Sequence, residues 1–176
     1  MPASRSESPG AGPDAAPAPT RLLFDISGVD LGATHADRPA IEKWIPHRGR
    51  MLLLDRVVWV NAGMTQGVAM RRVGADEFWV PGHFPSKPVF PGVLQVETAA
   101  QLSCYQWVVR KGTPSLAVFL RIENCVFRSM VVPGDDFYVL CQEIKWQKRR
   151  FVSRVQGLVG DRVTFEAELS GMCLEG

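Results

Sequence analysis

The chain has 176 residues, of which 46% are hydrophobic, 22% charged and 9% aromatic. These values suit one domain with a buried core, and they exclude a disordered chain and a disulfide scaffold. The formal net charge of +2 is too small to indicate a nucleic acid partner. No run reaches the roughly 18 apolar residues of a membrane-spanning helix, and residues 1–20 lack the apolar stretch of a signal peptide. We therefore expect a cytoplasmic protein without a membrane segment.

Residues 1–20 are rich in Pro, Ala, Ser and Gly and poor in large apolar side chains. Such a segment cannot bury enough surface to offset the entropy of ordering. We predict a disordered tail over residues 1–37, although Arg21–Ile26 could form a short strand or pack on the surface. The predicted globular domain covers residues 38–176.

The first half of this domain predicts a short helix and two strands before a long loop. Residues 80–92 contain four prolines, which exclude a helix or a central strand there. The expected elements before this loop are a helix over Arg38–Trp44, a strand over Met51–Val60 and a strand over Gly67–Val73.

A long helix is predicted over Gly92–Lys111, because Gly112 and Pro114 stop the pattern. Its apolar residues surround it on all sides, which is typical of a buried helix. Four β-rich segments follow, over Ser115–Phe127, Asp136–Trp146, Phe151–Leu158 and Arg162–Met172. We expect an α+β fold in which an antiparallel sheet, with these last four strands as a meander, curls around one central helix.

The four cysteines, Cys104, Cys125, Cys141 and Cys173, show no C-x-x-C spacing, and no histidine lies near enough in sequence to complete a zinc motif. We expect buried free thiols and no metal site.

Glu97 lies on an apolar stripe of the predicted helix, together with Val93, Val96 and Ala100. Burial disfavours a charged carboxylate, which suits a general acid. An ion pair across the core would also explain a glutamate at this position.

His83 lies in the loop that proline and glycine stiffen, and its imidazole can accept a proton at cellular pH. It could also serve only to close the loop through a hydrogen bond to a neighbouring carbonyl.

Gly92 follows Pro91 at the helix start, where an unpaired N–H and the helix dipole can stabilise a developing oxyanion. An ordinary Pro-Gly helix start would have the same sequence. A base, an acid and an oxyanion donor together suit removal of a proton next to a carbonyl and loss of a β-hydroxyl.

The segment Gly82–Glu97, GHFPSKPVFPGVLQVE, resembles the signature of hotdog-fold 3-hydroxyacyl-acyl-carrier-protein dehydratases of the FabZ type. Three further segments are similar to the same family: Ile45–Arg48, Leu52–Val57 and Val131–Asp135. The resemblance covers about residues 40–172, and it implies a hotdog fold.

The resemblance also implies that His83 and Glu97 are the catalytic pair and that no cofactor is required. His83 would take the C2 proton of a 3-hydroxyacyl thioester, the Gly92 N–H would stabilise the oxyanion, and Glu97 would protonate the leaving hydroxyl. The product would be a trans-2-enoyl thioester in fatty acid biosynthesis. Gln101, one turn beyond Glu97, is placed to orient the carboxylate, or it is a plain structural amide.

The family further implies a homodimer in which one subunit supplies the histidine and the other the glutamate, assembling to a hexamer as a trimer of dimers. Its partner would be acyl carrier protein, which presents the acyl chain on 4'-phosphopantetheine. Two alternatives are a FabA-type dehydratase-isomerase, which typically has Asp in place of Glu97, and a non-catalytic acyl-binding module.

Basic residues that could dock the acidic carrier protein gather in the second half of the chain. They could equally form the solvated rim of a hairpin. The candidates are Arg121, Arg128, Lys148, Arg149 and Arg150.

Overall fold

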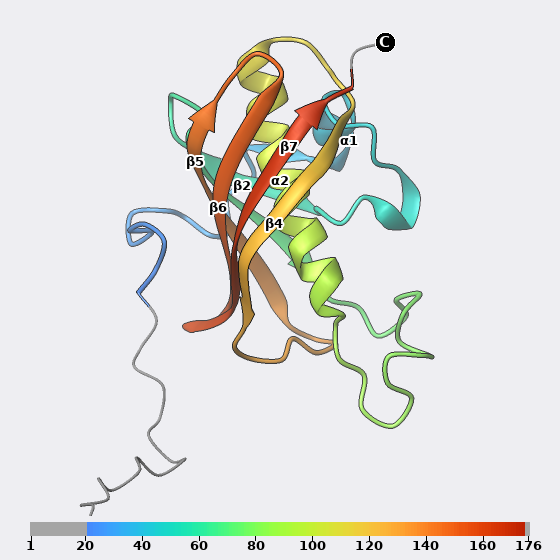
Figure 1. Ribbon diagram of the computed structural model, residues 1–176. Helices are drawn as coiled ribbons and strands as arrows, with labels where there is room; N and C mark the ends of the chain where they lie inside the picture. The colour runs from blue at the N-terminus through green and yellow to red at the C-terminus, as the bar shows by residue number, and fades with distance from the viewer. Residues whose placement is uncertain (1–20, 175–176) are drawn as a thin grey trace, which may run out of the picture.

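The computed structural model describes residues 21–174, and residues 1–20 and 175–176 lie outside the described part of the chain. In the described part, seven strands form one antiparallel sheet that curls around a single long helix, α2 (Gly92–Lys111) (Figure 1). This architecture is the α+β hotdog fold that the resemblance implies. No helix within residues 21–174 combines the length and the apolar character that crossing a membrane requires.

The strands lie in the order β1-β2-β3-β5-β6-β7-β4. Their bounds are β1 Ala36–Asp37, β2 Arg56–Val60, β3 Gln66–Arg72, β4 Ala117–Phe127, β5 Asp136–Trp146, β6 Arg150–Val159 and β7 Arg162–Cys173. A short helix, α1 (Arg38–Glu42), and a 3-10 turn over Gly49–Met51 precede β2. The predicted strand over 51–60 is therefore shorter than expected, because Leu52, Leu53 and Leu54 are buried outside the ladder.

The ends of α2 agree with the prediction. Pro91 is its N-cap, and Gly112 adopts a left-handed conformation (φ 76°) whose N–H bonds to the carbonyls of Val108 and Val109. A glycine accepts this backbone conformation without strain. The helix is buried along most of its length, but Val93 in its first turn is 73% exposed.

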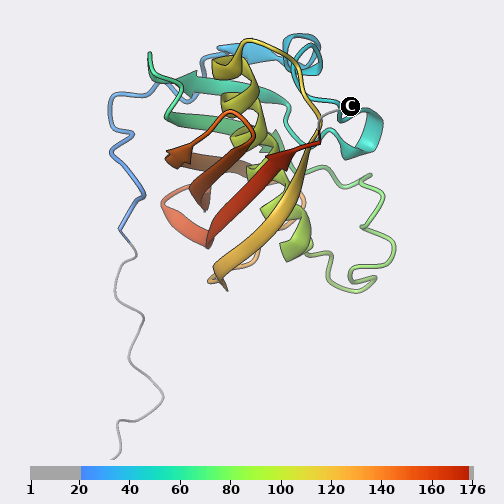
Figure 2. The ribbon, with the colours of Figure 1, turned by 45° about the horizontal axis from the view of Figure 1, so that its top comes forward.

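The late strands do not form the expected four-stranded meander. Strands β5, β6 and β7 are consecutive neighbours, whereas β4 pairs with β7 at the edge of the sheet (Figures 1 and 2). After β4 the chain crosses to the other side of β7. There the N–H of Gly134 donates to the carbonyl of Val73, and the N–H of Val73 donates to that of Asp135. These bonds place β5 beside β3.

Strand β4 is an exposed edge with many apolar side chains. The prediction of buried thiols is wrong at one position, since Cys125 on this strand is exposed while the other three cysteines are free and buried. The exposed large apolar residues of β4 are Phe119, Leu120, Ile122, Val126 and Phe127. A long apolar edge strand is normally covered by a partner.

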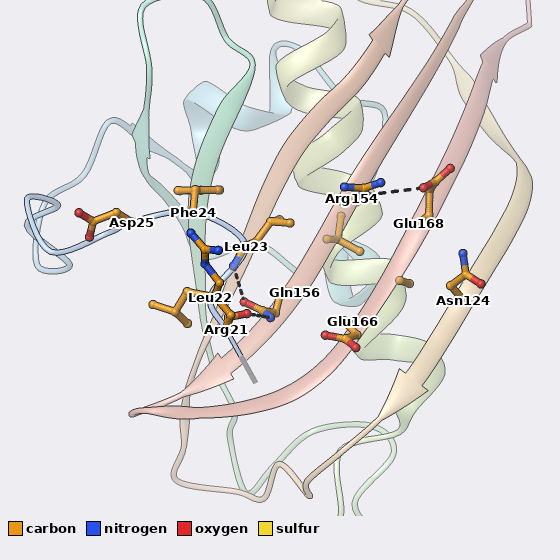
Figure 3. Close-up of a pocket in the computed structure, with 12 residues that line it drawn as sticks. Arg21, Leu22, Leu23, Phe24, Asp25, Asn124, Arg154, Gln156, Glu166 and Glu168 are labelled. Carbon is orange, nitrogen blue, oxygen red and sulfur yellow. Dashed lines mark hydrogen bonds and ion pairs between the residues drawn. The ribbon is translucent and has the colours of Figure 1, made fainter. Parts of the chain in front are cut away.

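The globular part begins earlier than residue 38, so the predicted tail boundary at residue 37 is wrong for residues 21–37. Side chains of this segment pack on the sheet face opposite α2, against a small apolar cluster that includes Val58, Met70 and Leu140. The side chain of Gln156 accepts a hydrogen bond from the N–H of Leu23 and donates one to the carbonyl of Arg21 (Figure 3). The predicted disorder of residues 1–20 lies outside the described residues.

Candidate active site

Glu97 lies in the second turn of α2, and its side chain is 21% exposed. Gln101, one turn further along, donates a 2.9 Å hydrogen bond from Nε2 to Oε1 of Glu97. The carboxylate of Glu97 is therefore partly buried, and a hydrogen bond from the same helix fixes its position.

The carboxamide of Gln101 is fully buried, and its orientation is fixed by the backbone. Its Oε1 accepts from the N–H of Leu53 at 2.8 Å, while its Nε2 also donates to the carbonyl of Met51 at 2.7 Å. Since an N–H only donates and a carbonyl only accepts, the amide cannot be turned around. Gln101 thus ties Glu97 to the segment that precedes β2.

His47 is a site residue that the sequence reasoning did not single out. Its Nε2 lies 3.3 Å from Oε1 of Glu97. The loop that carries it is closed by Arg48, which donates 2.7 Å hydrogen bonds to the carbonyls of Glu42, Ile45 and His47. The only sequence signal for this position is the similarity of Ile45–Arg48 to the family.

A cavity of about 50 Å³ adjoins Glu97 between α2 and the strands β4, β6 and β7. Cys104, two turns along the helix from Glu97, also lines it. Burial, with a smaller contribution from the charge of Glu97, raises the pKa of this thiol to about 12. The thiol is therefore neutral at cellular pH and has no nucleophilic role.

His83 lies in the loop before α2 with its ring held by Val89. Its Nδ1 is 2.8 Å from the carbonyl oxygen of Val89, and the N–H of Val89 donates to the carbonyl of His83 at 3.0 Å. Because a carbonyl can only accept, Nδ1 carries a hydrogen, and in the neutral ring the lone pair is on Nε2. His83 can therefore act as a base only through Nε2.

The structure does not bring His83 and Glu97 together within one chain. Within residues 21–174, no hydrogen bond, ion pair or ring contact joins them, and His83 does not line the cavity at Glu97. The loop that carries His83 extends away from the sheet beside the first turn of α2 in both ribbon views (Figures 1 and 2).

Gly92 is the first residue of α2, so its N–H has no helical partner. The ring of Phe127, at the end of β4, lies against its Cα, and a Cβ at this position would be 2.6 Å from Cε1 of that ring. Packing against Phe127 therefore explains a glycine at position 92, in addition to the close approach of a ligand that a glycine would allow.

The predicted docking residues do not form one cluster. Arg121 pairs with Glu123 at 3.2 Å, and Arg128 pairs with Glu166 near the other end of β4. Arg121 and Arg150 line one surface hollow of about 290 Å³. Lys148 and Arg149 belong to the turn between β5 and β6 that precedes Arg150.

A larger open hollow, of about 720 Å³, lies on the sheet face opposite α2 (Figure 3). Its two glutamates are both paired, Glu166 with Arg128 and Glu168 with Arg154 at 3.8 Å. It holds no histidine, so it offers no acid–base pair comparable to that of His83 and Glu97. Within the described ranges, no group of three or more His, Cys, Asp or Glu residues could hold a metal ion.

Comparisons with known proteins show the family of the chain. A family model described as a FabA-like domain matches residues 45–168. The 3-hydroxyacyl-[acyl-carrier-protein] dehydratase FabZ of Granulibacter bethesdensis is 36% identical over 81% of this chain and 85% of its own. FabZ of Alkaliphilus metalliredigens is 40% identical, over 74% of this chain and 88% of its own.

Among solved structures, the dehydratase heterocomplex ApeI:P from Xenorhabdus doucetiae is similar with a TM-score of 0.68. The match covers 77% of this chain and 91% of that chain at 15% identity. At this identity the likeness supports the fold alone.

Proposed function

The chain belongs to the FabA-like family, and we propose that it dehydrates 3-hydroxyacyl-[acyl-carrier-protein] to trans-2-enoyl-[acyl-carrier-protein] in fatty acid biosynthesis. The observation that carries this proposal is the pair of fixed groups in the family signature. The ring of His83 is fixed through Nδ1, and Glu97 is held through Oε1, while Oε2 forms no hydrogen bond within residues 21–174. The FabZ relatives carry this activity in their names.

In the proposed mechanism, Nε2 of His83 removes a proton from C2 of the thioester. The N–H of Gly92 and the helix dipole stabilise the negative charge that develops on the thioester oxygen. Protonated Glu97 gives its proton to the 3-hydroxyl as the C3–O bond breaks, and water leaves. The new double bond joins C2 and C3, and the histidine then returns its proton to the glutamate. No cofactor takes part.

We further propose a homodimer in which His83 of one subunit meets Glu97 of the other. The apolar edge of β4 supports this proposal, because its exposed side chains require cover. The separation of the two residues within the chain supports it as well. Assembly to a hexamer, as a trimer of dimers, and a cytoplasmic location belong to the same proposal. Light scattering of the purified protein tests the assembly.

The chemistry is tested by His83→Ala and Glu97→Gln, assayed with 3-hydroxyacyl carrier-protein substrates. Each change deletes a proton transfer that typically contributes a factor on the order of a hundred to ten thousand. His35→Ala is the matched control, because this side chain is exposed and distant in sequence from the signature. Near wild-type turnover in either site variant would contradict the mechanism.

The shared site is tested by refolding the two inactive variants together. A mixed dimer has one intact site, so up to about half of a dimer's activity should return if the residues meet across a two-fold axis. No recovery, with subunit exchange shown by differently tagged chains, would place both residues of a site in one subunit.

A further inference from the structure

Glu97 has two partners in its own chain, and both contact the same oxygen. Nε2 of Gln101 lies 2.9 Å from Oε1, and Nε2 of His47 lies 3.3 Å from it. Within residues 21–174, Oε2 takes part in no hydrogen bond or ion pair. The two oxygens of the carboxyl group are therefore distinct.

The hydrogen on His47 can be assigned from the surroundings of its other nitrogen. Nδ1 is buried and has no hydrogen-bond partner within the described residues. A doubly protonated ring would bury an N–H donor without an acceptor, which typically costs about 1–3 kcal/mol, and more for a charged group. A neutral ring with its hydrogen on Nε2 leaves only an uncharged acceptor unpaired at Nδ1, and it can donate to Glu97.

Within residues 21–174, no lysine or arginine lines the cavity at Glu97. Arg48, next to His47, uses its guanidinium on three backbone carbonyls. Cys104, which the charge of Glu97 influences, is a neutral thiol. Gln101 is uncharged.

We propose that His47 is a positioning residue, which as a neutral imidazole donates from Nε2 to Oε1 of Glu97 and thereby directs Oε2, with the acidic proton, toward the substrate hydroxyl. The proposal rests on the proposed function of Glu97 as the general acid. With Gln101 bonded to Oε1 and Nε2 of His47 3.3 Å from the same oxygen, Oε2 is the oxygen left to carry the proton that is delivered. A cationic His47 would instead hold Glu97 as its counter-ion and keep it from acting as an acid.

The tautomer of His47 can be tested without any substrate. The chain contains only three histidines, His35, His47 and His83, so long-range ¹H–¹⁵N spectra of the full-length labelled protein at neutral pH are readily assigned by substitution. We expect His47 with its hydrogen on Nε2 and His83 with its hydrogen on Nδ1. A signal with both nitrogens of His47 protonated, or with the hydrogen on Nδ1, would overturn the proposal.

The positioning role is tested by comparing His47→Ala with His47→Gln. A glutamine places a neutral N–H donor near the position of Nε2, whereas alanine removes it. We expect the alanine variant to lose about ten- to a hundredfold in kcat, the order of loss that follows a misplaced catalytic group. Its KM should stay within about threefold of wild type, because a group that acts only in the transition state affects kcat.

The glutamine variant should recover kcat to within about fivefold of wild type, and His35→Ala serves as the matched control. Equal losses in both His47 variants, or none in either, would contradict positioning through a donated hydrogen bond. An inactive wild-type protein would instead count against the proposed function, while the tautomer measurement would still decide the state of His47.

Discussion

Gln101 joins Glu97 to the backbone of the segment before β2, because one buried carboxamide bonds to the carboxylate, to the Met51 carbonyl and to the Leu53 N–H. In the described structure, no other side-chain amide connects the second turn of α2 to this segment by hydrogen bonds. Glu97, the acid of the proposed mechanism, thus belongs to the hydrogen-bond network that fixes the segment before β2.

Replacement of Gln101 by alanine should therefore affect both activity and stability. We expect kcat to fall about ten- to a hundredfold, since the carboxylate loses its fixed position. The buried N–H of Leu53 also loses its partner, at about 1–3 kcal/mol, and the partly buried carbonyl of Met51 loses its own at a smaller cost. Steady-state kinetics and urea unfolding measure the two effects.

Gln106→Ala is the matched control for this prediction. Gln106 is buried on the same helix, but its side chain bonds only to the carbonyl of Met64, at 3.1 Å. It should lose some stability and retain kcat. If both variants lower kcat equally, the effect of Gln101 is a general one on the helix.

Gly171 lines the cavity at Glu97, and a side chain at this position would clash with a neighbouring ring. A Cβ at Gly171 would lie 2.4 Å from Cζ of Phe151, whose ring is itself packed against Trp107 at a centroid distance of 5.5 Å. This ring is buried, so moving it disturbs its packing against Trp107. We expect Gly171→Ala to cost about 1–3 kcal/mol of unfolding free energy, the usual range for overpacking.

The double variant Gly171→Ala, Phe151→Leu should recover part of that loss, which a double-mutant cycle in urea measures. Gly63→Ala is the control, since its nearest contact would be an ordinary 3.7 Å to Thr65. Strict additivity of the two changes would show that the ring does not set the cost.

The segment from Arg21 should contribute to stability through its contact with the sheet. Deletion of residues 1–26 removes Leu22, Leu23 and Phe24, which pack on the apolar cluster around Val58 and Leu140. Full burial of one such side chain is worth about 1.5–3 kcal/mol, and these are only partly buried. We expect a Tm lower by several degrees and increased binding of an apolar dye, with deletion of residues 1–20 as the matched control. Equal Tm values for the two truncations would contradict this role.

Local sequence signals were enough to predict α2 and most strands. Proline and glycine mark both ends of α2, and β7 follows its predicted bounds to within one residue because most of its length alternates between a buried and a less buried face. These signals lie within a few residues of the elements that they define.

The features that sequence reasoning missed all depend on distant partners. The place of β4 beside β7 follows from pairing, which neither strand encodes alone. The packing of Leu23 requires Gln156, 133 residues away. His47 is a lone histidine in its loop, and only the fold brings it to Glu97.

The structure reduces the set of basic residues that are candidates for docking acyl carrier protein. Arg121 and Arg128 are already paired with glutamates. Arg150 and Lys145 line the same hollow as Arg121, and within residues 21–174 neither forms an ion pair. These two cations are therefore the better candidates to attract an acidic partner.

Charge reversal by Lys145→Glu and Arg150→Glu should raise KM for carrier-protein substrates by roughly threefold or more at low salt, since opposite charges speed the encounter of two proteins. The difference should shrink as salt rises, because the Debye length is already about 10 Å at 0.1 M. Turnover of a small thioester without the carrier protein should hardly change. Arg162→Glu, an exposed arginine at the start of β7, is the matched control and should leave both substrates unaffected. If both substrates lose activity equally in the Lys145 and Arg150 variant, these cations support the hairpin, and the carrier protein docks on another surface.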